Sequence, residues 1–191
     1  TATLTNAALT PLAVTLSTGQ TITIAAGATS GSVSIAAPAD DVYLDAGSVS
    51  RSISATTGGG FESLAVDTTP AVTTVSDTID TTTVSITGDA VVAEGATAAY
   101  TVSLTSPAQT AVSVNLAYSG IAADGSDFSG VATVTIPAGA SSAALNIATL
   151  QDLLAEGAES FTVSIASAAG GNFESLVISA ANGAATTSIT D

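Results

Sequence analysis

Thr149-Leu-Gln-Asp-Leu-Leu-Ala-Glu-Gly-Ala-Glu-Ser-Phe161 is the stretch of this 191-residue chain that best predicts its fold. It places Asp152, Glu156 and Glu159 in a loop between two runs, at 143–148 and 161–165, that alternate apolar and polar residues. Such alternation is typical of half-buried β-strands. We therefore expect a β-sheet protein with an acidic pole where this loop joins two strands.

The composition predicts an all-β fold and argues against an enzyme. Short alternating runs are separated by Gly, Asn, Asp and Pro, and no long stretch has helical periodicity. Cys and His are absent, so no thiol or imidazole is available as a nucleophile, a general base near neutral pH or a zinc ligand. A glycosidase would use two carboxylates, but its cleft would be rich in aromatic residues, which make up 4 % of this chain.

The charge balance excludes two classes of partner. Sixteen acidic residues stand against one base, Arg51, and such a surface repels nucleic-acid phosphates and anionic membranes. No apolar run is long enough to span a bilayer. We therefore expect a monomer that binds no nucleic acid and does not insert directly into a membrane. Because the first residue falls inside a strand-like run, we also expect the chain to be part of a longer protein.

The sequence contains two copies of one pattern. At a spacing of 112 residues, Thr21-Ile-Thr-Ile-Ala-Ala-Gly-Ala-Thr-Ser30 matches Thr133-Val-Thr-Ile-Pro-Ala-Gly-Ala-Ser-Ser142, and Gly58-Gly-Gly-Phe-Glu-Ser-Leu64 matches Gly170-Gly-Asn-Phe-Glu-Ser-Leu176. Further upstream the spacing is 100, where Leu12 stands opposite Val112. Two copies predict two tandem Greek-key β-sandwiches, at residues 1–78 and 79–191. The first copy has no counterpart of 82–98, so we expect it to lack its first strand, which we attribute to where the fragment was cut.

The second copy is predicted to be a seven-stranded sandwich. Its strands are expected at 82–87 with a continuation at 90–93, and at 97–104, 111–118, 132–136, 143–148, 160–166 and 184–189, with a turn at 168–171. Successive loops of a Greek-key sandwich alternate between its two ends. One end is therefore expected to hold these acids: Glu94, Asp124, Asp127, Asp152, Glu156, Glu159 and Asp191. Glu174 is expected at the opposite end.

An acidic pole of this kind has two interpretations. Unscreened like charges about 4 Å apart repel by on the order of 4 kcal/mol at an effective dielectric near 20, so a cation would stabilise the arrangement. Ligands that offer oxygen alone select a hard cation, and Ca²⁺ accepts six to eight oxygens in irregular geometry. The alternative is a solvated acidic rim that confers solubility. The residues by themselves leave both interpretations open.

Several motifs resemble the Calx-beta pattern. They are Glu94-Gly95 before an alternating strand, Gly125-Ser-Asp-Phe128, Thr135-Ile-Pro-Ala-Gly139, and Asp152 followed by Glu156-Gly-Ala-Glu-Ser-Phe161. The resemblance implies an immunoglobulin-like sandwich that binds calcium at one end. Carried over by position, the implied ligands are Glu94, Asp127, Asp152, Glu156 and Asp191. Gln151 stands where an acid is usual in this pattern.

The Ala/Thr/Ser-rich tandem format and stretches such as Ala39-Asp-Asp-Val-Tyr-Leu-Asp-Ala-Gly-Ser48 more closely resemble extender repeats of RTX-type giant bacterial adhesins, the large adhesion proteins secreted by type I systems. This resemblance implies a calcium-stabilised stalk, outside the cell at the bacterial surface, that projects terminal adhesion domains for attachment and biofilm formation. Its partners would be neighbouring repeats of the same chain, end to end. A calcium-dependent module that binds carbohydrate or protein is the alternative.

The first copy departs from the Calx-beta pattern, because Leu44 stands opposite Glu156. Its acids nevertheless gather near the predicted linker between the copies. We expect calcium to be held there by Asp40, Asp41, Asp45, Asp77 and Asp80, together with backbone carbonyls.

Overall fold

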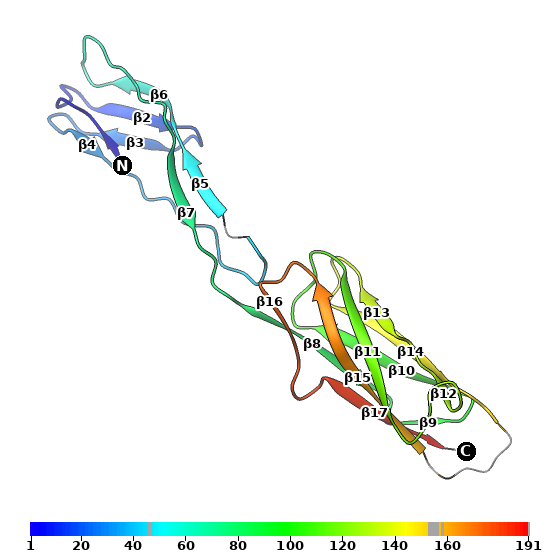
Figure 1. Cartoon of the computed structure of the whole chain (residues 1–191). Helices are drawn as coiled ribbons and strands as arrows, with labels where there is room; N and C mark the ends of the chain where they lie inside the picture. The colour runs from blue at the N-terminus through cyan, green and yellow to red at the C-terminus, as the bar shows by residue number, and fades with distance from the viewer. Residues whose placement is uncertain (46, 153–156, 158, 191) are drawn as a thin grey trace. The chain divides into compact units, whose positions relative to one another are not determined.

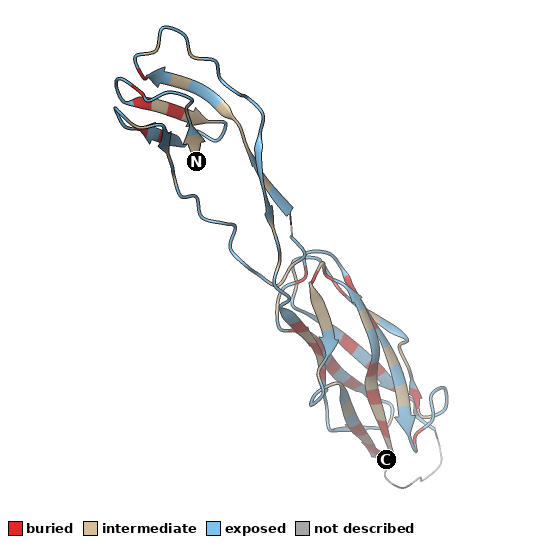
Figure 2. Cartoon of the chain, turned by 60° about the vertical axis from the view of Figure 1, so that its left-hand side comes forward, coloured by how far each residue is buried: buried red, intermediate tan, exposed pale blue. Residues whose placement is uncertain are grey.

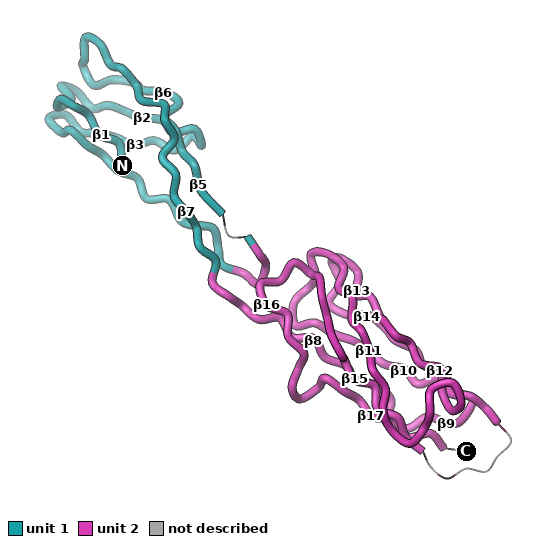
Figure 3. The backbone as a smooth tube through the Cα atoms, viewed as in Figure 1, with its two compact units in different colours: residues 1–40, 45–77 teal, residues 41–44, 78–191 magenta. Residues whose placement is uncertain are grey.

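The computed structural model describes residues 1–45, 47–152, 157 and 159–190, and these residues form strands and loops without any helix. The all-β prediction is therefore confirmed. The described part of the chain accordingly offers no helix that would be long and apolar enough to cross a membrane. Two compact units are formed, the first by Thr1–Asp40 and Asp45–Asp77, the second by Asp41–Leu44 and Thr78–Asp191 (Figure 3).

The second unit is an immunoglobulin-like sandwich of two five-stranded sheets (Figure 1). Its strands are β8 (Thr81–Gly88), β9 (Val91–Ala93), β10 (Thr97–Leu104), β11 (Val112–Gly120), β12 (Phe128–Ser129), β13 (Thr133–Ile136), β14 (Ser142–Thr149), β15 (Glu159–Gly170), β16 (Ser175–Ile178) and β17 (Ala184–Thr190). One sheet has the order β12-β14-β10-β8-β16 and the other β13-β11-β15-β17-β9. The pairs β16–β8 and β17–β9 are parallel, and the other pairs are antiparallel.

The core of this unit lies between the two sheets. Strand β10 alternates between exposed and buried residues, with Ala98, Tyr100 and Val102 facing inward, as its β-prone sequence predicts (Figure 2). Within this core the rings of Phe128 and Phe161 stack with their centroids 4.3 Å apart. The large apolar side chains thus hold the sheets together and fix which loops meet at each end.

Three details of the second unit differ from the sequence-based expectation. Glu159 is the first residue of β15, paired with Ile189, and does not belong to the preceding loop. Because β15 pairs with β11 as far as Gly170, the turn expected at 168–171 begins at Gly171. The short strands β12 and β16 were not expected, since neither has a clear alternating pattern.

The first unit is smaller and consists of three short sheets. Its strands are β1 (Ala2–Thr3), β2 (Leu12–Leu16), β3 (Thr21–Ile24), β4 (Ser30–Gly31), β5 (Gly47–Arg51), β6 (Ile53–Gly58) and β7 (Ala71–Val75), in sheets β1-β4, β3-β2-β6 and β5-β7. A small cluster of Leu12, Val14, Ile22 and Ile24 forms its buried core. The pairing of Thr3 with Ser30 has the register of Ser103 with Ser142 in the second unit, at spacings of 100 and 112.

Candidate metal centre

One candidate centre is the end of the second unit where β9 leads into β10 and where β14 ends. We call it the Glu94 pole and define it by Glu94, Asp127, Gln151 and Asp152. The Glu94 carboxylate accepts a hydrogen bond from the backbone N–H of Asp152 (2.7 Å) and another from Nε2 of Gln151 (3.1 Å). The backbone of Glu94 donates to the carbonyl of Thr190 (2.8 Å), which ties this loop to the last strand.

The loop before β12 supplies the other acids of this end. Asp127 accepts the backbone N–H of Ala123 at Oδ2 (2.6 Å), and Asp124 accepts that of Gly130 at Oδ1 (2.7 Å). These bonds hold the loop closed. The carbonyl of Asp127 also accepts the N–H of Leu150 (2.9 Å), so the loop is joined to the residues that lead to Asp152. Three segments that are far apart in sequence therefore meet at the Glu94 pole.

The structure tests only part of the predicted ligand set at this pole. It joins Glu94 to Asp152 directly and brings the backbone of Asp127 to the same segment. Glu156 and Asp191 lie outside the described residues. Among the described residues of the Glu94 pole, no three carboxylates come within 4.8 Å of one another. Calcium binding at the pole therefore stays a prediction.

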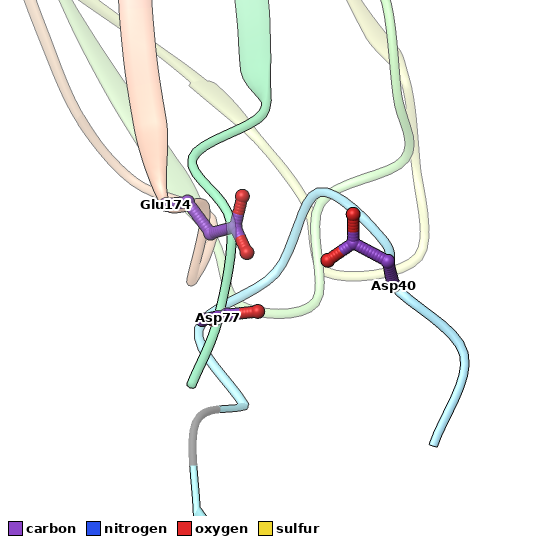
Figure 4. Close-up of side chains that lie close together, drawn as sticks. All are labelled: Asp40, Asp77 and Glu174. Atoms are coloured by element: carbon purple, nitrogen blue, oxygen red, sulfur yellow. The ribbon is translucent and has the colours of Figure 1, made fainter. Parts of the chain in front are cut away.

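A second candidate centre lies in the first unit. The carboxylates of Asp40 and Asp77 each place an oxygen within 4.8 Å of the other, although the two residues are far apart in sequence (Figure 4). Oδ2 of Asp77 also accepts the backbone N–H of Asp45 (3.3 Å). Three of the five acids predicted near the linker thus belong to one place in the first unit.

The remaining two acids of that prediction belong to the second unit. Oδ1 of Asp41 accepts a hydrogen bond from the backbone N–H of Tyr43 (2.8 Å). Both residues lie in the short segment Asp41–Leu44, which is part of this unit. The backbone N–H of Asp80 donates to the carboxylate of Glu174, which is also labelled in Figure 4. Glu174 in turn donates its own N–H to the carbonyl of Val42 (3.1 Å).

The segment Asp41–Leu44 is anchored to the second unit through an aromatic contact. The ring of Tyr43 stacks on Phe173 with centroids 5.5 Å apart, and its hydroxyl donates to the carbonyl of Pro107 (2.5 Å). The N–H of Leu44 donates to the carbonyl of Asn172 (3.1 Å). Residues that the repeat pattern assigns to the first copy are thus packed in the second unit.

Sequence reasoning missed two of the hydrogen bonds that these acids accept. Gln151 was noted only as a departure from an acidic pattern, yet it is a hydrogen-bond donor to Glu94. Glu174 was placed at the opposite end of the sandwich, but its link to Asp80 was not expected. The recurrence of Phe-Glu-Ser at 61–63 and 173–175 was the available signal for Glu174.

The chemistry that both centres offer is that of carboxylate, amide and carbonyl oxygens. Such a donor set fits a hard divalent cation, above all Ca²⁺, which tolerates irregular coordination. It does not fit zinc or copper, because the sequence contains neither Cys nor His. If calcium binds, Glu94 and Asp127 would hold it at the pole, and Asp40 and Asp77 would hold it in the first unit.

Comparison with known proteins gives one family and a set of structural likenesses. The model of the LapA domain family matches residues 1–78 and 80–191. Among solved structures, the apo form of the Calx CBD1 domain is 22 % identical, covering 58 % of this chain and 96 % of that one, with a TM-score of 0.49.

Two further structures are similar at the same level. CBD12 from CALX1.2 is 21 % identical over 57 % of this chain and 45 % of its own, with a TM-score of 0.49. The calcium-binding domain CBD12 of CALX1.1 is 23 % identical over 58 % and 44 %, with a TM-score of 0.47. No curated protein matches the chain.

Proposed function

The chain belongs to the LapA domain family, and from this membership we propose that it is a calcium-stabilised structural extender of a bacterial cell-surface adhesin. In this role it has no catalytic activity. It forms part of an extracellular stalk, secreted by a type I system, that projects terminal adhesion domains for attachment and biofilm formation. Its partners are neighbouring repeats of the same polypeptide, end to end, with one repeat at 1–78 and the next at 79–191.

The observation that carries the calcium proposal is the convergence of Asp40 and Asp77 in the first unit. Two carboxylate oxygens within 4.8 Å repel each other. For unit charges at 4.8 Å the repulsion amounts to about 3.5 kcal/mol at an effective dielectric of 20, and solvent and salt reduce it at an exposed site. A divalent cation reverses its sign. Asp45, whose backbone already contacts Asp77, lies close enough to contribute a further oxygen.

The Glu94 pole is proposed as the second calcium centre. Its ligands are Glu94, Asp127 and Asp152, completed by Glu156 and Asp191. The amide of Gln151 and the N–H of Asp152 now satisfy the Glu94 carboxylate. Calcium would exchange these donors for metal bonds, so this centre is expected to bind more weakly than one with acids at every position.

Calcium acts on the folded state by mass action. At a free concentration ten times the dissociation constant, one site adds about 1.4 kcal/mol to the free energy of unfolding. For a unit of this size that gain corresponds to a rise in melting temperature of roughly 6–11 °C. Extracellular calcium modules bind in the millimolar range, so the ion is available where the proposal places this chain.

The test is a thermal melt of the chain in EDTA, in millimolar CaCl₂ and in millimolar MgCl₂. We expect an upward shift with Ca²⁺ that Mg²⁺ does not reproduce. The double variant Asp40→Asn/Asp77→Asn should lose the shift of the first unit and keep that of the second. Glu94→Gln/Asp152→Asn should show the opposite pattern.

Asp67→Asn is the matched control, because Asp67 is exposed, lies in the first unit and is hydrogen-bonded to the side chain and the backbone N–H (2.9 Å) of Thr69. It removes one negative charge, where each double variant removes two, and should leave the calcium shift unchanged. Melts that are identical in EDTA and in CaCl₂ would show that the acids form a solvated rim. A calcium-dependent signal on a carbohydrate array, without any effect on the melt, would favour a ligand-binding module.

A further inference from the structure

The chain of the second unit crosses from one sheet to the other at residues 179–183, which join β16 to β17 (Figure 1). The carbonyl of Asn182 accepts the N–H of Ile86 on β8, in the sheet that contains β16 (2.8 Å). The next carbonyl, that of Gly183, accepts the N–H of Ile165 on β15, in the sheet that contains β17 (2.8 Å). Two consecutive carbonyls thus tie the crossing to both sheets, and the ties depend on the length of the backbone between them.

The side-chain amide of Asn182 and the nitrogen of Gly183 are placed to react with each other. Asn182 is exposed, and its backbone N–H donates to Oγ of Ser179 (3.1 Å). Within the described residues, neither the side-chain amide of Asn182 nor the N–H of Gly183 has a hydrogen-bond partner. Gly183 has no Cβ to shield its nitrogen, and its backbone is the most permissive of any residue. Closure of a five-membered ring between adjacent residues is favoured because the reacting groups are already held together.

The other asparagines of the chain lack this combination. Each of them is followed by a residue that has a Cβ. Asn115 and Asn172 also have amides that donate to neighbouring side chains, at 2.9 and 2.7 Å. Asn146 lies within β14, which is paired with β10. Asn6 is exposed and outside the strands, so it is the internal comparison that differs from Asn182 in the residue that follows it.

We propose that Asn182-Gly183 is a self-modification site, at which the folded chain converts asparagine into isoaspartate with water as the co-reactant. The nitrogen of Gly183 loses its proton and forms a bond to Cγ of Asn182. The bond from Cγ to the amide nitrogen breaks, and ammonia leaves with that proton. Water then opens the resulting succinimide ring. Opening at Cγ gives aspartate, and opening at the backbone carbonyl carbon gives isoaspartate, so the sequence needs neither an oxidant nor a reductant.

The isoaspartate product alters both ties of the crossing. Its backbone runs through Cβ and Cγ and is longer by one methylene carbon, and the carbonyl that accepts the N–H of Ile86 becomes a carboxylate outside the main chain. The crossing has little room for the added atom, because even a Cβ at Gly183 would lie 2.7 Å from the carbonyl oxygen of Ser179. A buried N–H that loses its acceptor destabilises the fold. The reaction needs no calcium, so it holds whether or not the proposed function does.

The test of the reaction ages the whole chain in mildly alkaline buffer with EDTA and follows each asparagine by peptide mapping and by an isoaspartate-specific methyltransferase. We expect conversion at Asn182 that accelerates with pH, because the nitrogen attacks after losing its proton. It should be at least about tenfold faster than at Asn6, which corresponds to about 1.4 kcal/mol in activation free energy. Asn182→Gln keeps an amide and the backbone ties but would have to close a six-membered ring, so position 182 should stay unconverted. Conversion of Asn182 that is no faster than that of Asn6, or that occurs only in urea, would overturn the site.

The structural consequence is tested on the isoaspartyl chain after its chromatographic separation. Asn182→Asp is the matched control, since it carries the same added charge in a backbone of normal length. The isoaspartyl chain should unfold at lower urea concentration than this control, measured by tyrosine fluorescence. Hydrogen exchange should be faster at the N–H groups of Ile86 and Ile165, which the crossing binds. Equal urea midpoints and equal exchange in the two chains would overturn the effect of the modification on the ties between the sheets.

Discussion

Gln151 and Glu94 form a hydrogen-bonded pair at the acidic pole that was predicted to bind calcium. The amide of Gln151 donates to the Glu94 carboxylate, which also accepts the N–H of Asp152. Both oxygens of the Glu94 carboxylate thus accept a hydrogen bond from the protein itself. An acid at position 151 would remove the donor and add a ligand.

We therefore predict that Gln151→Glu changes the stability of the second unit in opposite directions under two conditions. In EDTA the variant should be less stable by about 1–2 kcal/mol, because a neutral donor is replaced by a charge next to Glu94. In millimolar CaCl₂ it should be at least as stable as wild type, and its calcium affinity, measured by titration calorimetry, should be higher. Gln20→Glu, in the first unit, is the charge control. A variant that is destabilised equally in both conditions would contradict calcium binding at this pole.

How far the sequence predicts this centre is clear from the same residues. The meeting of Glu94 with Asp152 follows from the alternation of loops in a Greek-key sandwich, and the structure joins them by a hydrogen bond. The donor role of Gln151 could not be predicted, because it depends on the side-chain direction at the end of β14. Glu156 and Asp191 lie outside the described residues, so their roles as ligands stay predictions.

Tyr100 and Tyr118 give the second unit a defined response to alkali. Burial raises the pKa of both hydroxyls, and the carboxylate of Asp124 adds to the effect at Tyr118. Above about pH 10 the unfolded chain therefore releases protons that the folded chain retains. The contribution of these two tyrosines to stability should be constant below this pH and should fall as the pH rises further.

Urea denaturation at a series of pH values from 8 to 11 measures this effect. Tyr118→Phe should be less stable at pH 8 by about 1–3 kcal/mol, since the N–H and the carbonyl of Val131 both lose the hydroxyl as partner. Its stability should also fall less steeply above pH 10 than that of wild type. Stability that rose with pH in this range would contradict the prediction.

At the scale of single strands, alternation predicts where a strand lies better than it predicts what the strand pairs with. The bounds of β10 coincide with the predicted 97–104. The alternating residues at 143–148 lie in β14, as predicted. Their counterparts in the first unit at 32–36, after β4, do not form a strand. Alternation is a local property, but a strand also needs a neighbour. For residues 32–36 the sequence gives the pattern and the described structure gives no neighbour.

Close approach between strands explains a glycine that the sequence does not mark as special. A Cβ at Gly88, the last residue of β8, would lie 2.0 Å from Cδ1 of Tyr100. The hydroxyl of Tyr100 meets Oγ1 of Thr187, so the ring is held at both ends and has little room to move.

We predict that Gly88→Ala destabilises the second unit by about 1–3 kcal/mol through overpacking. Gly47→Ala is the control, because a Cβ there meets only an ordinary contact, 3.6 Å from the carbonyl of Asp45. Urea denaturation of the two variants compares them. If Gly88→Ala proves as stable as Gly47→Ala, the ring of Tyr100 can move aside and the close packing in β8 is not required.

At the scale of the whole chain, the division into units does not follow the division into repeats. The repeat pattern assigns residues 1–78 to one copy, yet Asp41–Leu44 belongs to the second unit, and the chain passes between units at 40/41, 44/45 and 77/78. The two units also differ in their interiors. The first has a core of Leu12, Val14, Ile22 and Ile24, while the second has a continuous core that includes stacked phenylalanines. We therefore expect the first unit to unfold at lower denaturant concentration than the second.

All three tyrosines of the chain, Tyr43, Tyr100 and Tyr118, belong to the second unit, so tyrosine fluorescence reports on that unit alone. We predict that Tyr43→Ala, a change within the first repeat of the sequence, lowers the stability measured by this signal by about 1–3 kcal/mol. The reason is that Tyr43 stacks on Phe173 and donates to Pro107. Leu44→Ala should change it by less than about 0.5 kcal/mol, since that side chain is 60 % exposed and its hydrogen bond to Asn172 is made by the backbone. If Tyr43→Ala instead left the tyrosine transition unchanged and shifted only the earlier transition, Asp41–Leu44 would belong to the first unit, and the fold would divide where the repeats do.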